Sequence, residues 1–231
     1  MSYSSKNEYL KRYVEALPQV VSADEVNVED SIIRYISLEI EKVGAVIARQ
    51  LTVEDGPELY DFYFQGLSER ARRLFIPYPL FHTPPSSAEE LSQRIANWRK
   101  EDDWSAIIIE KDGGINGLGI LKRFRTEQVT SGIAIRDDLL EMGLGYCLQM
   151  IIVGQARLLD LEKFHVKVIS DNMASVRLHE KCGFKKTGIV PWNGYEDLRN
   201  YLNESDNSGK SKATERNIIE MVIELNDEER D

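Results

Sequence analysis

Two glycines separated by one residue, Gly143 and Gly145, lie where a predicted strand gives way to a predicted helix, in the stretch EMGLGYCLQMIIVGQARLLDL at residues 141–161. The first turn of a helix leaves backbone N–H groups without intrahelical partners, and the helix dipole adds a partial positive charge there. A glycine lets a phosphate approach that backbone closely, because it has no side chain. The stretch is therefore either a phosphate-binding turn or only a tight connection between a strand and a helix.

Two common phosphate-binding motifs do not fit this turn. A dinucleotide site requires the pattern G-x-G-x-x-G, and Leu148 stands at the position of the third glycine. A P-loop requires Gly-Lys followed by Ser or Thr, and this turn has no such sequence. The ligand must therefore be identified from another part of the chain.

A second motif, NMASVRLHEKCGF at residues 172–184, follows about thirty residues later. The pair resembles the GNAT (general N-acetyltransferase) superfamily, whose motifs are Gln/Arg-x-x-Gly-x-Gly/Ala and Asn-x-x-Ala/Ser-x-x-Leu-Tyr-x-Lys-x-Gly-Phe. The residues that match the second motif are Asn172, Ser175, Leu178, Lys181, Gly183 and Phe184. The resemblance covers roughly residues 45–225 and leaves the first 44 residues outside it.

The resemblance implies that acetyl-CoA, or another acyl-CoA, binds between two parallel strands that splay apart, at residues 131–135 and 163–168. The first strand would hold the pantetheine arm, the glycine turn would receive the pyrophosphate, and the second motif would lie near the thiol. The cofactor-binding residues implied in this way are Ile133, Ala134, Ile135, Met142, Gly143, Leu144, Gly145, Tyr146, Asn172, Ser175 and Lys181. An amine would then attack the thioester directly while a strand N–H polarises its carbonyl oxygen.

The sequence departs from the family motif just before the glycine turn. Leu140 stands where the family usually has Gln or Arg, and Glu141 brings a negative charge close to the expected pyrophosphate. An anion at this position weakens phosphate binding. We therefore expect Arg136 or Lys181 to supply the missing positive charge.

Two candidate catalytic residues also differ from the family pattern. His179 replaces a tyrosine near the departing thiolate, and a protonated imidazole can act as a general acid. Ser131 stands where many members have a glutamate base, and its hydroxyl can hold a water that relays the proton. A structural role is the alternative for His179, and His165 can either face the substrate or pack in the structure.

The elements that would position these residues follow from hydrophobic spacing and turn residues. Residues 1–44 are expected to be an extension with a helix at 6–17 and a strand at 31–40. Residues 45–231 are expected to form one GNAT-like domain. Its predicted elements are a strand at 45–52, helices at 53–67, 68–77 and 88–100, a hairpin at 104–125, a strand at 128–138, a helix after the glycine turn, a strand at 163–170, a helix at 172–184 and a strand at 217–225.

This order predicts a mixed α/β (α+β) fold, with a central, mostly antiparallel sheet that contains one splayed parallel pair and is flanked by helices. The polar segment at 205–216 is expected to be a loop, and Trp192 and Tyr195 are candidates for the wall of the acceptor pocket.

Composition limits the partners of the chain. Its 231 residues carry a formal net charge of -10, which argues against nucleic acid as a ligand because phosphate backbones bind basic surfaces. No apolar run is long enough for a membrane span, and the N-terminus lacks the apolar core of a signal peptide. The two cysteines, Cys147 and Cys182, form no metal-binding pattern. We expect a cytoplasmic protein that binds no metal, nucleic acid or membrane.

The function predicted from these observations is an acyl-CoA-dependent N-acyltransferase that acetylates a primary amine on a small molecule or a protein. Two alternatives are a non-catalytic, regulatory acyl-CoA-binding module and a partner-binding scaffold that has lost CoA. The N-terminal 44 residues can cover the acceptor cleft or form a homodimer.

Overall fold

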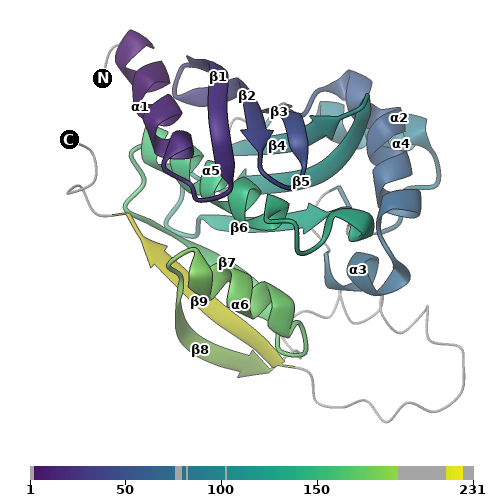
Figure 1. The fold of residues 1–231 in the computed structure, drawn as a ribbon. Helices are drawn as coiled ribbons and strands as arrows, with labels where there is room; N and C mark the ends of the chain where they lie inside the picture. Colours follow the sequence, from purple (N-terminus) through teal and green to yellow (C-terminus); the bar gives the residue numbers. More distant parts are fainter. Residues whose placement is uncertain (1–2, 76–79, 82, 102, 192–216, 226–231) are drawn as a thin grey trace, which may run out of the picture.

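The computed structural model describes residues 3–75, 80–81, 83–101, 103–191 and 217–225. In this part of the chain nine strands form a single sheet in the order β1-β2-β3-β4-β5-β6-β7-β9-β8 (Figure 1). The strands are β1 (Val20–Glu29), β2 (Ile32–Ile40), β3 (Gly44–Gln50), β4 (Trp104–Lys111), β5 (Gly114–Lys122), β6 (Thr130–Ile135), β7 (Lys163–Ile169), β8 (Lys185–Pro191) and β9 (Asn217–Glu224). All neighbouring strands are antiparallel except β6 and β7. The predicted fold class is therefore confirmed.

Helices cover both faces of this sheet and enclose two hydrophobic cores. The helices are α1 (Tyr3–Glu15), η1 (Val53–Asp55), α2 (Gly56–Asp61), η2 (Phe62–Gly66), α3 (Glu69–Leu74), α4 (Ala88–Trp98), η3 (Asp137–Leu139), α5 (Leu144–Leu158) and α6 (Met173–Lys181). The first core joins one face of the sheet to α1, α5 and α6, and the second joins the opposite face to α2, η2 and α4. None of the described helices has both the length and the apolar character needed to cross a membrane.

The hairpin predicted at 104–125 is present as β4 and β5. Its turn consists of Asp112 and Gly113, both with positive φ, as a tight two-residue hairpin turn requires. The two strands of this hairpin lie in the centre of the sheet. The strand β6 pairs with β5 along its whole length, from Thr130 to Ile135.

Residues 1–44 add more structure than the predicted helix and single strand. The segment SADEVNVED, which we did not expect to be a strand, lies within or next to β1, which pairs with β2 at one edge of the sheet. Leu10 and Val14 of α1 belong to the first core and are fully buried. The extension therefore continues the sheet and packs against α5.

The strand β8 was also not predicted. It lies at the opposite edge of the sheet, where β9 is its one partner among the described strands, at the lower end of the molecule in Figure 1. The polar segment at 205–216, together with Trp192 and Tyr195, lies outside the described residues.

Candidate functional site

The strands β6 and β7 diverge along the sheet. They pair only through Thr130 with His165 and Ser131 with Val166, although both strands continue beyond these pairs. On its other edge β6 stays paired with β5 as far as Ile135. The part of β6 after Ser131 therefore presents an edge without a strand partner among the described residues, and this edge faces the gap between the two strands.

Alternation along β6 identifies which peptide groups face this gap. The carbonyl of Val129 accepts a hydrogen bond from the N–H of His165 on β7, and the N–H of Arg136 donates to Asn116 on the opposite side. Since peptide groups alternate between the two edges of a strand, the N–H and C=O groups of Ile133 and Ile135 point into the gap. Free groups of this kind can bind an extended amide-containing ligand as an added strand would.

The glycine turn lies beside the open end of the gap. Gly143 is the N-cap of α5 and has a φ of 89°, a left-handed conformation that favours glycine. A Cβ added at Gly145 would lie 3.6 Å from both Ile135 Cγ1 and Leu178 Cδ2. The turn, the end of β6 and α6 therefore meet at one place.

The first N–H groups of α5 are available at this turn. The backbone bond from Cys147 N to Gly143 O, 3.1 Å long, begins the helical pattern. The N–H groups of Leu144, Gly145 and Tyr146 precede it and have no partner within the helix. With the dipole of this 15-residue helix they provide a site for an anion.

The two basic residues proposed to compensate for Leu140 and Glu141 have different surroundings. Lys181 Nζ lies 4.7 Å from the centre of the Tyr146 ring, which brings its charge to the first turn of α5. Arg136 forms two hydrogen bonds to the carboxylate of Asp138, at 3.0 and 3.2 Å. Lys181 is therefore the better placed of the two to contact an anion at the turn.

The second motif begins just after β7 and forms the helix α6 and the turn that follows it. Asn172 is the N-cap of α6, and its Oδ1 accepts a hydrogen bond of 3.3 Å from Ser175 N. Met142 and Tyr146 lie against the first core and are partly exposed. Of the cofactor-binding residues predicted from the motifs, Ile135 and Lys181 thus contact the glycine turn, whereas Asn172 and Ser175 bond to each other at the start of α6.

His179 is buried in α6, with an exposed fraction of only 3%. Its Nδ1 lies 2.7 Å from the carbonyl oxygen of Ser175, and its ring packs edge-on against Phe184. Burial lowers the pKa of this imidazole, and the bond to Ser175 only partly opposes that shift. This environment disfavours the protonated form that the predicted general-acid role needs.

Ser131 lies at the closed end of the gap, next to a glutamine that sequence reasoning did not identify. Gln149 of α5 is fully buried, and its Nε2 lies 3.5 Å from Ser131 Oγ. The Oε1 of Gln149 has no hydrogen-bond partner. Gln149 and Gln155 are the two polar side chains that are fully buried in α5, and their position within a mostly apolar stretch of sequence could have identified them.

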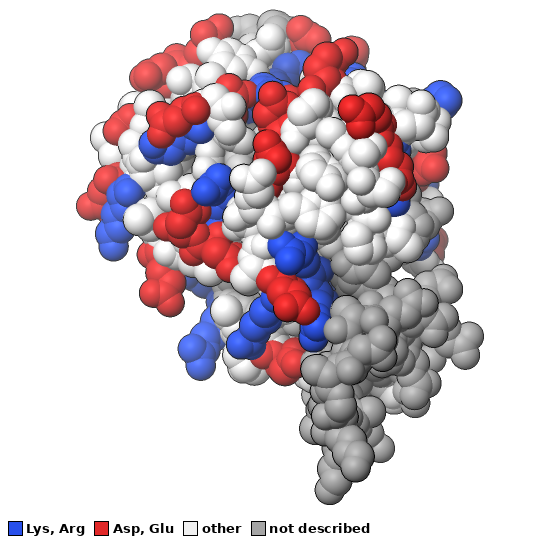
Figure 2. All heavy atoms as spheres, turned by 90° about the vertical axis from the view of Figure 1, so that its right-hand side faces the viewer, with Lys and Arg blue, Asp and Glu red and all other residues white. Residues whose placement is uncertain are grey.

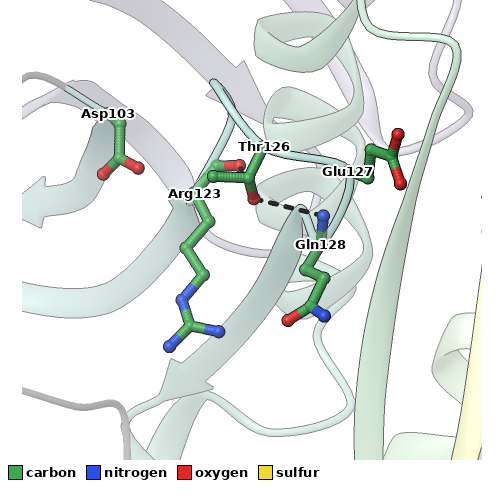
Figure 3. A pocket seen from close by; sticks show the side chains of 5 residues that line it. All are labelled: Asp103, Arg123, Thr126, Glu127 and Gln128. Carbon is green, nitrogen blue, oxygen red and sulfur yellow. Dashed lines mark hydrogen bonds between the residues drawn. The ribbon is translucent and has the colours of Figure 1, made fainter.

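An open, polar hollow of about 510 Å³ lies at the other end of β6 (Figure 3). Its lining residues are Asp103, Arg123, Thr126, Glu127 and Gln128. All but Asp103 belong to the loop that precedes β6, so the hollow is separate from the glycine turn. Within the described residues no three His, Cys, Asp or Glu side chains cluster as metal ligands do.

Figure 2 shows Lys and Arg side chains gathered, with acidic ones among them, at the height of α3. Two of the α3 arginines have local partners: Arg72 donates hydrogen bonds to the carbonyls of Phe64 and Leu67, and Arg73 pairs with Glu69. We therefore assign no separate site to this surface.

Comparison with known proteins agrees with this geometry. A family model described as an acetyltransferase (GNAT) domain matches residues 46–185. No curated protein sequence matches the chain.

Several solved structures share the fold. The GNAT domain of PAT from S. lividans has a TM-score of 0.60 at 14% identity, over 83% of this chain and 97% of that one. Spermidine N-acetyltransferase from Vibrio cholerae, in complex with CoA and spermine, has a TM-score of 0.58 at 16% identity, over 78% of this chain and 95% of that one. The yncA protein from Salmonella typhimurium, solved with its cofactor acetyl-CoA, has a TM-score of 0.56 at 17% identity, over 79% of this chain and 95% of that one.

Proposed function

The chain belongs to the GNAT acetyltransferase family, and we propose that it transfers an acetyl group from acetyl-CoA to a primary amine on a small molecule or a protein. One observation carries the proposal: the gap between β6 and β7 opens beside the glycine turn that begins α5. An extended amide-containing arm and a pyrophosphate are the two parts of CoA that such an arrangement suits.

The residues around the gap fit an acyl-CoA. The peptide groups of Ile133 and Ile135 would bind the amides of the pantetheine arm. The N–H groups of Leu144, Gly145 and Tyr146 would bind the pyrophosphate, and Lys181 would add a positive charge. Since Lys181 contacts the Tyr146 ring in the first turn of α5, it would supply there the positive charge that Leu140 and Glu141 do not provide.

The chemistry would take place near the closed end of the gap. Acetyl-CoA supplies an acyl group that is already activated as a thioester, so the protein has to hold the amine against it and remove a proton. The amine attacks the thioester carbon, the C–S bond breaks, and the CoA thiolate leaves. A strand N–H facing the gap stabilises the negative charge that develops on the carbonyl oxygen. A water held by Ser131 Oγ, which projects towards Gln149 of α5, would relay the proton of the amine through the gap to the departing thiolate.

A panel assay tests this proposal. Purified full-length protein is incubated with acetyl-CoA and primary amines of different classes, and both thiol release and the mass of the acetylated amine are measured. We expect both products to appear together. Binding of CoA esters without any acetylated amine would favour a non-catalytic regulatory module. Absence of binding would favour a scaffold that has lost CoA.

A matched pair of glycine variants connects the activity to the turn. Gly143→Ala and Gly183→Ala both force a side chain into a left-handed conformation, since their φ angles are 89° and 94°. The new Cβ at Gly143 would also press on Gln19 Cγ, 2.7 Å away, so urea unfolding of both variants is measured to separate a loss of stability from a loss of CoA affinity. Only Gly143 lies at the proposed pyrophosphate site. We expect Gly143→Ala to raise the KM for acetyl-CoA about tenfold or more, and Gly183→Ala to leave it within about twofold. Equal effects of the two variants would mean that the turn is only structural.

A further inference from the structure

A row of polar side chains crosses three neighbouring strands next to the closed end of the gap. Lys122 of β5 pairs with Thr130 of β6, and Thr130 pairs with His165 of β7. Residues paired directly across neighbouring strands project from the same face, with Cβ atoms about 5 Å apart. The three side chains therefore lie side by side on one face of the sheet.

This face is the one opposite α5. Ser131 contacts Gln149 of α5, so its neighbour Thr130 points to the other side. Ala134, in the same alternation as Thr130, belongs to the second core with α2 and α4. On β7, Phe164 and Val166 belong to the first core, which leaves His165 on the same side as Thr130. An acceptor bound on this face of the sheet would therefore enter the gap from the side that faces away from α5.

Two side chains of this row lack hydrogen-bond or ion-pair partners among the described residues. The hydroxyl of Thr130 is buried and has no hydrogen-bond partner. Lys122 is partly buried and forms no ion pair or hydrogen bond with any residue that the structure describes. Buried polar groups are nearly always paired, and an unpaired ammonium is costly to remove from water. An unpartnered donor beside an unpartnered cation is the arrangement expected of a site whose partner is a ligand.

The surrounding charges favour an anionic ligand. Arg123 follows Lys122 in the chain, and both Arg123 and Lys167 of β7 repel the Lys122 ammonium and add to the effect of burial in lowering its pKa. The carboxylate of Glu220 lies 3.3 Å from Lys167 Nζ and neutralises that residue, and Asp103 and Glu127 line a hollow together with Arg123 and offset its charge. The ammonium of Lys122 is left without a carboxylate partner among the described residues, and an anionic ligand would supply one.

We propose that Lys122, Thr130 and His165 form a subsite for an anionic group on the amine acceptor. This inference rests on the proposed function and narrows its substrate class to amines that carry a carboxylate or a phosphate. The ammonium of Lys122 would neutralise the anion, and the Thr130 hydroxyl and a His165 ring N–H would donate hydrogen bonds to it. Thr130 directly precedes Ser131 at the closed end of the gap. In a suitable acceptor, the anionic group and the reacting amine would therefore be separated by only a few covalent bonds.

Pairs of amines that differ only in the anionic group test the proposal. Ethanolamine is compared with phosphoethanolamine, tyramine with tyrosine, and histamine with histidine, using the full-length protein and CoA. Calorimetry measures binding without requiring turnover, and thiol release with acetyl-CoA measures turnover. We expect the anionic member of at least one pair to bind about tenfold or more tightly than its neutral partner. The phosphate and carboxylate pairs show which anion is preferred.

Variants of Lys122 and Thr130 test whether the preference for anionic amines arises from this row of side chains. Lys122→Gln should weaken binding of the anionic amine about tenfold and leave the neutral amine within twofold. Lys111→Gln is the matched control, because Lys111 is a partly buried lysine at the opposite end of the β4–β5 hairpin and pairs with Asp112. Thr130→Val should act in the same direction as Lys122→Gln with a smaller effect.

These binding and turnover measurements distinguish failure of the anion subsite from failure of the acetyltransferase activity. The subsite is ruled out if anionic amines bind no more tightly than neutral ones, or if Lys122→Gln weakens both members of a pair equally. Acetylation of neutral amines alone would rule out the subsite and leave the acetyltransferase intact. Selective binding of anionic amines without any acetylation would support the subsite and count against the proposed activity.

Discussion

The two side chains predicted to be catalytic lie in very different surroundings. Ser131 lies where β6 and β7 separate, within reach of Gln149 on one side and next to the gap on the other. His179 lies inside the first core region, where its Nδ1 is held by a backbone carbonyl of its own helix. The residue types alone made both plausible. Burial distinguishes them, and it favours Ser131 as the group that can contact a substrate.

The burial of His179 predicts how stability depends on pH. Burial places its pKa in the folded protein below the ordinary value of about 6.5, so the unfolded chain takes up a proton first as the pH falls. Its contribution to stability is therefore complete above pH 6.5 and decreases as the pH falls through that value towards the folded pKa. The slope is limited to about 1.4 kcal/mol per pH unit for one proton.

Urea unfolding between pH 8 and pH 5 measures this effect. We expect the free energy of unfolding to fall below about pH 6.5 in the wild type and to fall less steeply in His179→Leu. His165→Gln removes another histidine and serves as the control. A slope that is unchanged in His179→Leu would show that this histidine takes up its proton equally in both states.

At the level of elements, two glutamines of α5 have opposite roles. Gln155 donates to Ser31 O at 2.7 Å and accepts from Ile33 N at 2.8 Å, so it connects the turn between β1 and β2 to α5. Gln149 has one long contact, to Ser131, and an oxygen without a partner. One glutamine therefore stabilises the fold, whereas the other leaves hydrogen-bonding capacity next to the gap.

The same substitution at both positions separates these roles. Gln155→Leu leaves a backbone N–H and a carbonyl without partners and should cost about 2–3 kcal/mol of stability. Gln149→Leu removes a group that is already poorly satisfied and should change stability by less than about 1 kcal/mol. Equilibrium urea unfolding measures both. Equal destabilisation by the two variants would contradict this assignment.

Sequence patterns predicted the central elements well and the two edges of the sheet poorly. The predicted strands at 104–125, 163–170 and 217–225 carry either apolar runs or a clear alternation of apolar and polar residues, and all of them are present. The strands β1 and β8 lie at the two edges of the sheet that the described residues form, and they carry charged side chains, which protect an edge from pairing with other chains. Their charges weaken the apolar alternation that identifies a strand in a sequence.

The site was predictable where it consists of contiguous motifs. The glycine turn and the start of α6 could be recognised because each is a short stretch with fixed spacing. The row of Lys122, Thr130 and His165 could not, since it depends on the pairing register of three strands that no single segment encodes. The structural surroundings of His179 depend likewise on which face of α6 packs against the sheet.

The whole molecule combines the family domain with an N-terminal unit that is built into the same sheet. The family match begins at residue 46, whereas the first core already includes Leu10, Val14 and Ile36. Gln19 also approaches the glycine turn: a Cβ added at Gly143 would lie 2.7 Å from Gln19 Cγ. The extension thus packs against the helix and the turn on which the proposed cofactor site depends.

The central claim is that acetyl-CoA binds in the gap between β6 and β7 with its pyrophosphate at the start of α5. Hydrogen–deuterium exchange of the intact protein, with and without acetyl-CoA, tests this placement most directly. We expect slower exchange at the amides of Ile133 and Ile135 and at those of Leu144–Tyr146, because these N–H groups would be bonded by the ligand. Binding of acetyl-CoA that leaves exchange at both segments unchanged would show that the cofactor binds elsewhere.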